Sequence, residues 1–68
     1  MSKYRKGQIW SSPNGKEKIE ILSDPNKFGQ ISFKETNHGV EAVFYSRPED
    51  FVDLTIEMHD MILKEVQR

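Results

Sequence analysis

Four short runs of alternating apolar and polar residues limit the folds open to this chain. Clusters of Gly, Pro, Asn and Asp separate these runs. The runs cover residues 8–12, 16–23, 30–36 and 40–45. Alternation with period two is typical of a strand that buries one face. The short connections cannot hold a parallel crossover, which needs about a dozen residues or more, so neighbouring strands must be antiparallel. The sequence therefore predicts a four-stranded antiparallel β-meander over residues 8–45.

The turn and face assignments follow from the same pattern. Asn14-Gly15 is a strong hairpin signal because both residues tolerate positive φ. In the third run Ile31 and Phe33 share the inward face. The fourth run is apolar on both faces, which predicts a strand that is central or curled over the core and not a free edge.

Residues 47–66 follow a different pattern, in which apolar residues recur at helical spacing. Pro48 suits the first helical position, and Ser46 with Glu49 fits a capping box. We therefore expect one C-terminal α-helix over 47–66 that closes the core, giving a single α+β domain over 1–68. The alternation at 54–58 leaves a rival open: a single-turn helix at 48–52, a strand at 54–58 that completes a five-stranded barrel, and a final helix.

A continuous helix would carry two apolar stripes, although covering a small sheet needs only one. The stripe expected to cover the sheet consists of Phe51, Leu54, Thr55, Met58, Met61, Ile62 and Val66. The second stripe is surplus, and it predicts a partner interface made of Val52, Ile56, His59 and Leu63. The polar remainder includes an acidic face at Asp53, Glu57 and Asp60.

Composition narrows the class of protein. The chain has 68 residues and no cysteine, which excludes disulfides and thiolate metal sites and leaves one small core of marginal stability. No apolar run approaches the ~20 residues of a membrane span, and no apolar signal core follows the first residues, so we expect a cytoplasmic protein. Residues 1–47 carry eight Lys/Arg against five Asp/Glu, whereas residues 48–68 carry two against six.

Several short segments resemble the small SH3-like β-barrel proteins of bacteria and their phages. They are Lys6-Gly7-Gln8-Ile9-Trp10, the strand Gly29-Gln30-Ile31-Ser32-Phe33 and the closing Glu49-Asp50-Phe51. The resemblance covers residues 6–52 and implies an SH3-like meander. It also implies a small phage-type protein that modulates a host machine.

Catalytic chemistry has little support in the sequence. Hydroxyl groups are the only nucleophiles, and neither His38 in a turn nor His59 on the helix has the spacing of a base with an orienting partner. No metal site and no cofactor site is expected, because outward carboxylates on a helix lack a wrapped oxygen cage. We hypothesise a non-catalytic protein-interaction module, with a protein partner or a second copy on the surplus stripe.

The alternative is a nucleic-acid-binding module. Its patch would combine a basic arm over residues 1–7 with lysines of the sheet, through Lys3, Tyr4, Arg5, Lys6, Lys16, Lys18 and Lys34. Small barrels bind single strands by stacking bases on exposed aromatic rings beside Lys and Arg. Trp10 is expected in the core rather than on that surface, and the pI of 6.1 does not favour nucleic acid.

Overall fold

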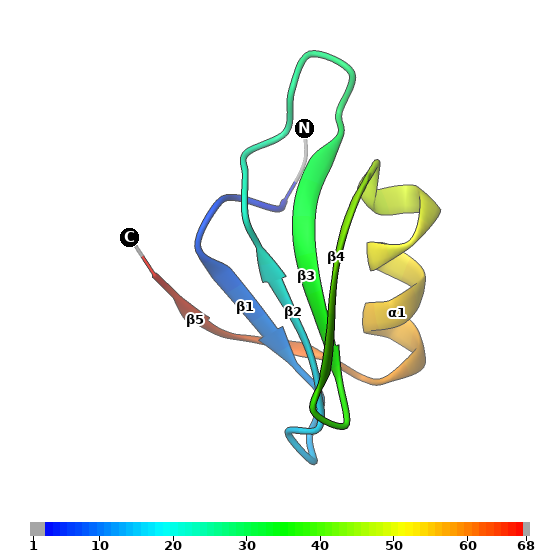
Figure 1. Cartoon of the computed structure of the whole chain (residues 1–68). Coiled ribbons are helices and arrows are strands. Elements are labelled where there is room, and N and C mark those ends of the chain that lie inside the picture. The colour runs from blue at the N-terminus through cyan, green and yellow to red at the C-terminus, as the bar shows by residue number, and fades with distance from the viewer. Residues whose placement is uncertain (1–2, 68) are drawn as a thin grey trace.

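The computed structural model describes residues 3–67, which form a five-stranded antiparallel sheet with one short α-helix (Figure 1). The strand order is β4-β3-β2-β1-β5. The first four strands form the expected meander, and the chain then crosses by a 3-10 turn, η1, and the helix α1 to place β5 beside β1. The bounds are β1 Gln8–Ser11, β2 Glu17–Ile21, β3 Ile31–Asn37, β4 Val40–Ser46, η1 Pro48–Asp50, α1 Val52–Met58 and β5 Ile62–Val66.

The hairpin between β3 and β4 shows how the turn residues set the register. Asn37 pairs with Val40, so the loop has only two residues. His38 and Gly39 both have positive φ, at 51° and 84°, as a type I′ turn requires. The register then places Phe33 opposite Phe44 on one face and Lys34 opposite Val43 on the other.

The core lies between one face of the sheet and α1. The buried apolar side chains from β2 and β3 are Ile19, Ile21, Ile31 and Phe33. Of these, Ile31 and Phe33 were predicted to face inward. Tyr4, Val52 and Met61 complete the cluster, with Trp10, Phe51 and Ile56 packed partly buried against it. Trp10 therefore joins the core, and its ring meets Tyr4 edge-on at a centroid separation of 5.7 Å.

The expected helix over 47–66 is wrong, because α1 ends at Met58. Asp60 adopts a left-handed conformation with φ of 52°. The Met61 N–H donates to the Ile56 carbonyl at 2.9 Å and the Asp60 N–H to the Glu57 carbonyl at 3.4 Å. These two bonds form a Schellman motif, which satisfies the last carbonyls of a helix and turns the chain away from its axis. Asp takes the position usually held by Gly, so the sequence carries no obvious stop signal.

The alternative prediction is correct in part, because a single helical turn, η1, begins at Pro48 and the sheet has five strands. It is wrong about the segments that follow. Residues 54–58 are helical, and the fifth strand is Ile62–Val66, where both readings placed helix. β5 pairs antiparallel with β1, with a register irregularity between Ile9 and Trp10. The pairing with β1 decides the conformation of this segment. Local helical periodicity in the sequence contains no information about that pairing.

The helix is also rotated relative to the expectation, so that only part of the expected stripe faces the core: Phe51 packs against it, whereas Leu54 and Met58 do not. Val52, assigned to the outer stripe, is fully buried at 0% exposure. Leu54 and Met58, assigned to the inward stripe, are 60% and 76% exposed. The side chain that anchors this orientation is Phe51, which stacks on Phe33 at 5.5 Å and on Phe44 at 5.4 Å between ring centroids.

The segment before β1 is tied to the domain and is not a free arm. The Tyr4 side chain is buried, the Lys6 N–H donates to Asp24 Oδ1 at 2.9 Å, and the Gly7 N–H donates to the Ile21 carbonyl. Residues 1–2 of the expected arm lie outside the described residues.

Candidate functional site

A run of exposed apolar side chains lies on β4. This strand is at the edge of the sheet, so the expectation that it is central is wrong. Every residue from Val40 to Tyr45 is exposed, with Val40 at 71%, Val43 at 64% and Tyr45 at 58%. Side chains of a strand alternate between its two faces, so β4 presents apolar groups on both. α1 covers only part of the core-facing side, through the contact of Phe51 with Phe44.

The backbone of β4 is open along its outer edge. The His38 N–H donates to the Lys16 carbonyl and the Leu22 N–H to the Ser32 carbonyl, so even-numbered residues of β3 face β2. Backbone groups of successive residues point to opposite sides of a strand, which directs Phe33, Glu35 and Asn37 toward β4. Their register partners are Phe44, Ala42 and Val40. The N–H and C=O groups of the odd-numbered residues of β4, namely Glu41, Val43 and Tyr45, therefore point away from the sheet.

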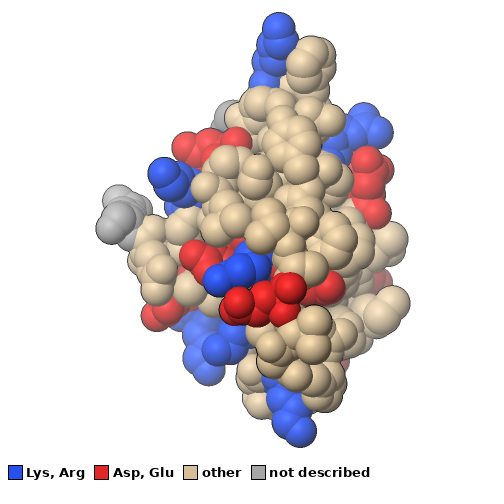
Figure 2. Space-filling view, viewed as in Figure 1, with Lys and Arg blue, Asp and Glu red and all other residues tan. Residues whose placement is uncertain are grey.

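A flank of α1 extends this apolar surface. Phe51 immediately precedes the helix and stacks on Phe44 of β4. At ~100° per residue, Leu54 and Met58 fall on one side of α1, ~40° apart, with Glu57 ~60° and Asp53 ~100° from Leu54. Figure 2 shows a largely uncharged surface over the upper middle of the molecule, with a compact group of charged side chains below it. We call this surface the β4–α1 face and define it by Val40, Ala42, Val43, Phe44, Tyr45, Leu54 and Met58.

The residues expected to form a partner interface do not come together as an exposed stripe. Val52 belongs to the core and Ile56 packs half-buried against it. His59 is half-buried at the end of α1, and Leu63 lies on β5, where it pairs with Trp10. The helix that would have aligned them ends at Met58, so its period does not continue to Leu63.

The three acidic residues also separate into different environments. Asp53 accepts a hydrogen bond from the Tyr4 hydroxyl, which ties α1 to the segment before β1. Burial raises the pKa of the Tyr4 phenol, and the bond to Asp53 raises it further. Glu57 is exposed on α1, whereas Asp60 lies in the left-handed turn after it. Among residues 3–67 no group of His, Asp and Glu side chains could hold a metal ion.

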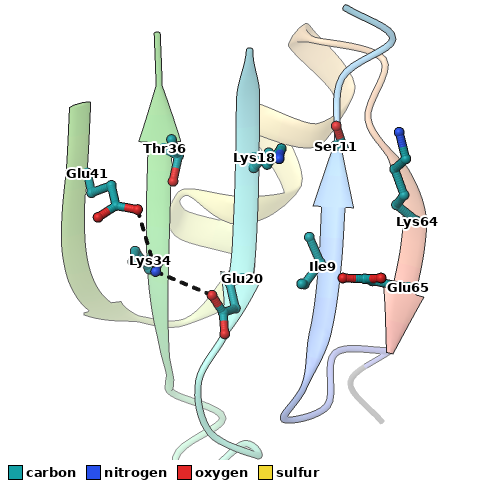
Figure 3. A pocket seen from close by; sticks show the side chains of 9 residues that line it. All are labelled: Ile9, Ser11, Lys18, Glu20, Lys34, Thr36, Glu41, Lys64 and Glu65. Atoms are coloured by element: carbon teal, nitrogen blue, oxygen red, sulfur yellow. Dashed lines mark ion pairs between the residues drawn. The ribbon is translucent and has the colours of Figure 1, made fainter. Parts of the chain in front are cut away.

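The face of the sheet opposite α1 forms a hollow of about 360 Å³ (Figure 3). On β3, Lys34 lies between two carboxylates, with Nζ 3.5 Å from Glu20 and 3.6 Å from Glu41. Lys18, Lys64 and Glu65 line the same hollow together with Ile9, Ser11 and Thr36. Three lysines meet three glutamates here, so the hollow offers no excess positive charge to a phosphate backbone.

The expected nucleic-acid patch is divided between separate regions. Lys18 and Lys34 lie in the hollow, Lys16 lies exposed in the turn before β2, and Lys3, Arg5 and Lys6 belong to the segment before β1. The Lys3 ammonium lies 5.5 Å from the centre of the Tyr4 ring. Tyr4 itself is only 2% exposed and cannot stack on a base. The arrangement therefore lacks the exposed aromatic platform that single-strand binding needs.

One polar cluster joins the β1–β2 turn to the β3–β4 turn. The Ser12 hydroxyl donates to Glu17 Oε2 at 2.7 Å, and His38 Nε2 lies 3.4 Å from Glu17 Oε1. The Ser12 bond lowers the pKa of Glu17, burial opposes this shift, and the nearby His59 and His38 add to the lowering. Ser12 is buried, and the lowered pKa of Glu17 makes its carboxylate a weak base for activating a serine nucleophile. We assign this cluster a structural role in holding the two turns together.

No protein-family model, curated protein or solved structure matches this chain. Within residues 3–67, no helix has the length and apolar character needed to cross a membrane.

Proposed function

We propose that the chain is a small non-catalytic protein–protein interaction module that binds its partner through the β4–α1 face. The observation that carries this proposal is the seven-residue edge strand β4, exposed and apolar on both faces. Exposed strand edges that are long and apolar promote pairing with another chain, and natural proteins usually protect them with charges, bulges or covering segments. Apolar patches on small domains commonly mark such interfaces.

The other edge of the sheet supports the choice of β4. β5 is shorter, carries Lys64 and Glu65, and has a register irregularity against β1. These features discourage edge-to-edge association. β4 has one charged residue, Glu41, and its carboxylate is 3.6 Å from Lys34 of the neighbouring strand.

The resemblance to small phage and bacterial SH3-like proteins adds a context to this proposal. Five antiparallel strands, the last of which returns beside the first, are compatible with an SH3-like barrel. In that context the module acts in the cytoplasm and modulates a host protein. The nucleic-acid alternative is not favoured, because Lys34 is paired with carboxylates and Tyr4 is buried.

Affinity capture from a lysate of the source cells tests the protein-binding role. We expect a protein other than the chain itself to be retained by the wild type and lost with the double variant Leu54→Glu/Met58→Glu. Glu57→Lys on the same helix is the matched control, since Glu57 is exposed but lies outside the β4–α1 face. Retention of the same protein by the double variant would contradict the proposed surface. Capture of no protein by the wild type would contradict the protein-binding role.

A further inference from the structure

We propose that the outer edge of β4 pairs with β4 of a second copy, antiparallel and centred on Val43, so that two sheets join into one. Self-pairing of β4 rests on the protein-binding role proposed above and adds a second copy at the open backbone edge, beside the Leu54 and Met58 side of the face that the other protein is proposed to contact. The occupant of an open strand edge is another extended backbone, because only a strand offers alternating N–H and C=O groups at the right spacing.

The direction of the backbone groups restricts the register. Glu41, Val43 and Tyr45 point their N–H and C=O groups outward, so they must pair with each other in the two copies. A two-fold axis at Val43 pairs Val43 with Val43 and Glu41 with Tyr45 of the partner, and it uses all seven residues of β4. Each of the three hydrogen-bonded pairs exchanges two bonds, about six in all. An axis at residue 42 or 44 leaves part of the strand unpaired, and one at Glu41 sets two carboxylates against each other.

The side chains fit the same register. On the core-facing side, Ala42 lies opposite Phe44 of the partner, so a small residue meets a large one on each side of the axis. On the other side, Val43 meets its own copy, and Glu41 lies opposite the phenol of Tyr45. Like charges directly opposite each other would destabilise an antiparallel pair, and this register sets no like charges opposite each other.

The position of α1 adds to this contact. A two-fold axis between antiparallel strands of one sheet stands perpendicular to the sheet, so both helices lie on the same face of the joined sheet. The exposed Leu54 and Met58 flanks of the two copies then lie on that face, on either side of the new seam. The apolar side chains of β4 that α1 leaves uncovered, Val40 and Ala42, lie on the same face of the sheet. The contact is isologous and closes as a dimer.

Cysteine cross-linking reads out the register directly, because the chain has no cysteine of its own. Opposite residues of a hydrogen-bonded pair lie ~5.5 Å apart between Cα atoms, within the ~4.4–6.8 Å range of disulfides. We expect Val43→Cys to form a disulfide-linked dimer on mild oxidation. Ala42→Cys and Phe44→Cys should not form one, because each residue is offset by two positions along the strand from the same residue of the partner. The two Cα atoms are then more than ~7 Å apart, too far for a disulfide. Cross-linking of Ala42→Cys or Phe44→Cys in place of Val43→Cys would overturn the Val43 register.

Sedimentation of the unmodified chain over a range of concentrations tests the dimer itself. We expect a monomer–dimer equilibrium that Val43→Lys weakens at least about tenfold, since it places two ammonium groups opposite each other. Ile62→Lys on β5 is the matched control, because Ile62 is equally exposed on the other edge, and it should leave the equilibrium unchanged. A strict monomer, or weakening by Ile62→Lys but not by Val43→Lys, would overturn self-pairing. A monomer that still captures a different protein, lost in Leu54→Glu/Met58→Glu, would overturn self-pairing and leave the protein-binding role standing.

Discussion

The substitution Val52→Ala tests the orientation of α1, on which the exposure of the β4–α1 face depends. Val52 is fully buried in the core between α1 and the sheet. The change removes two carbon groups, each worth ~0.8 kcal/mol on burial, and leaves a cavity that adds to the loss. We therefore expect the free energy of unfolding to fall by ~2–3 kcal/mol. In a domain of this size each kcal/mol shifts the melting temperature by ~4–8 °C, so the loss corresponds to a shift of about 10 °C or more.

Leu54→Ala is the matched control on the same helix. It deletes more apolar atoms than Val52→Ala, but Leu54 is 60% exposed, so we expect a loss of no more than ~0.5 kcal/mol. Both variants would be unfolded in urea and followed by circular dichroism. The protein concentration must be low, because self-association stabilises the folded state by mass action. A larger loss for Leu54→Ala than for Val52→Ala would refute the reasoning, because α1 would then bury the stripe that the sequence pattern favours.

Three further predictions concern the turns and the start of the sheet. Because the Ser12 hydroxyl lowers the pKa of Glu17, its stabilisation is present above the ordinary value of 4.5 and is lost as the pH falls through the lower folded value. Glu17→Gln should therefore show a shallower fall in unfolding free energy below pH 4.5 in urea titrations, and an unchanged slope would contradict this. Asp60→Gly should raise the unfolding free energy by up to about 1 kcal/mol, because Gly adopts the left-handed conformation freely; a loss of stability would argue against the Schellman motif. Gly7→Ala should cost about 2 kcal/mol or more in chemical denaturation, because φ is +96° and the added Cβ would meet the Gln67 carbonyl oxygen. Gly15→Ala, with open space around it, should cost less, and equal losses would contradict the close approach of β5.

The local patterns in the sequence predict the meander well. Period-two alternation and the turn residues locate the first four strands and the inward face of β3, because these features depend on neighbours within a few residues. Ile31 and Phe33, for example, are buried as expected. The same logic identifies the His38-Gly39 turn, where both residues have positive φ.

The C-terminal third could not be predicted in this way, because its structure depends on distant contacts. Ile62–Val66 is a strand since it pairs with β1, more than 50 residues earlier in the chain. The stop after Met58 depends on Asp60 in a conformation that Gly usually adopts, so no sequence signal marks it. Helical spacing continued across this stop and joined Val52 to Leu63 in one stripe that the folded chain does not contain.

The candidate surface was missed for a related reason. The apolar residues on both faces of 40–45 were interpreted as a sign of a central strand, which is the usual explanation for such a run. In the structure the same residues lie at an open edge, where they are exposed. An edge strand with two apolar faces is a signal for a partner, but sequence alone does not distinguish it from a buried strand.

Amide hydrogen exchange along β4, measured residue by residue at several protein concentrations, tests the central claim most directly. We predict an alternating pattern at low concentration, in which Ala42 and Phe44 are protected by β3 while Val43 and Tyr45 exchange rapidly. As the concentration rises, Glu41, Val43 and Tyr45 should become protected together. Rapid exchange of these three amides at every concentration would contradict pairing of the β4 edge with a second copy. Slow exchange of all three even at the highest dilution would contradict the open edge itself.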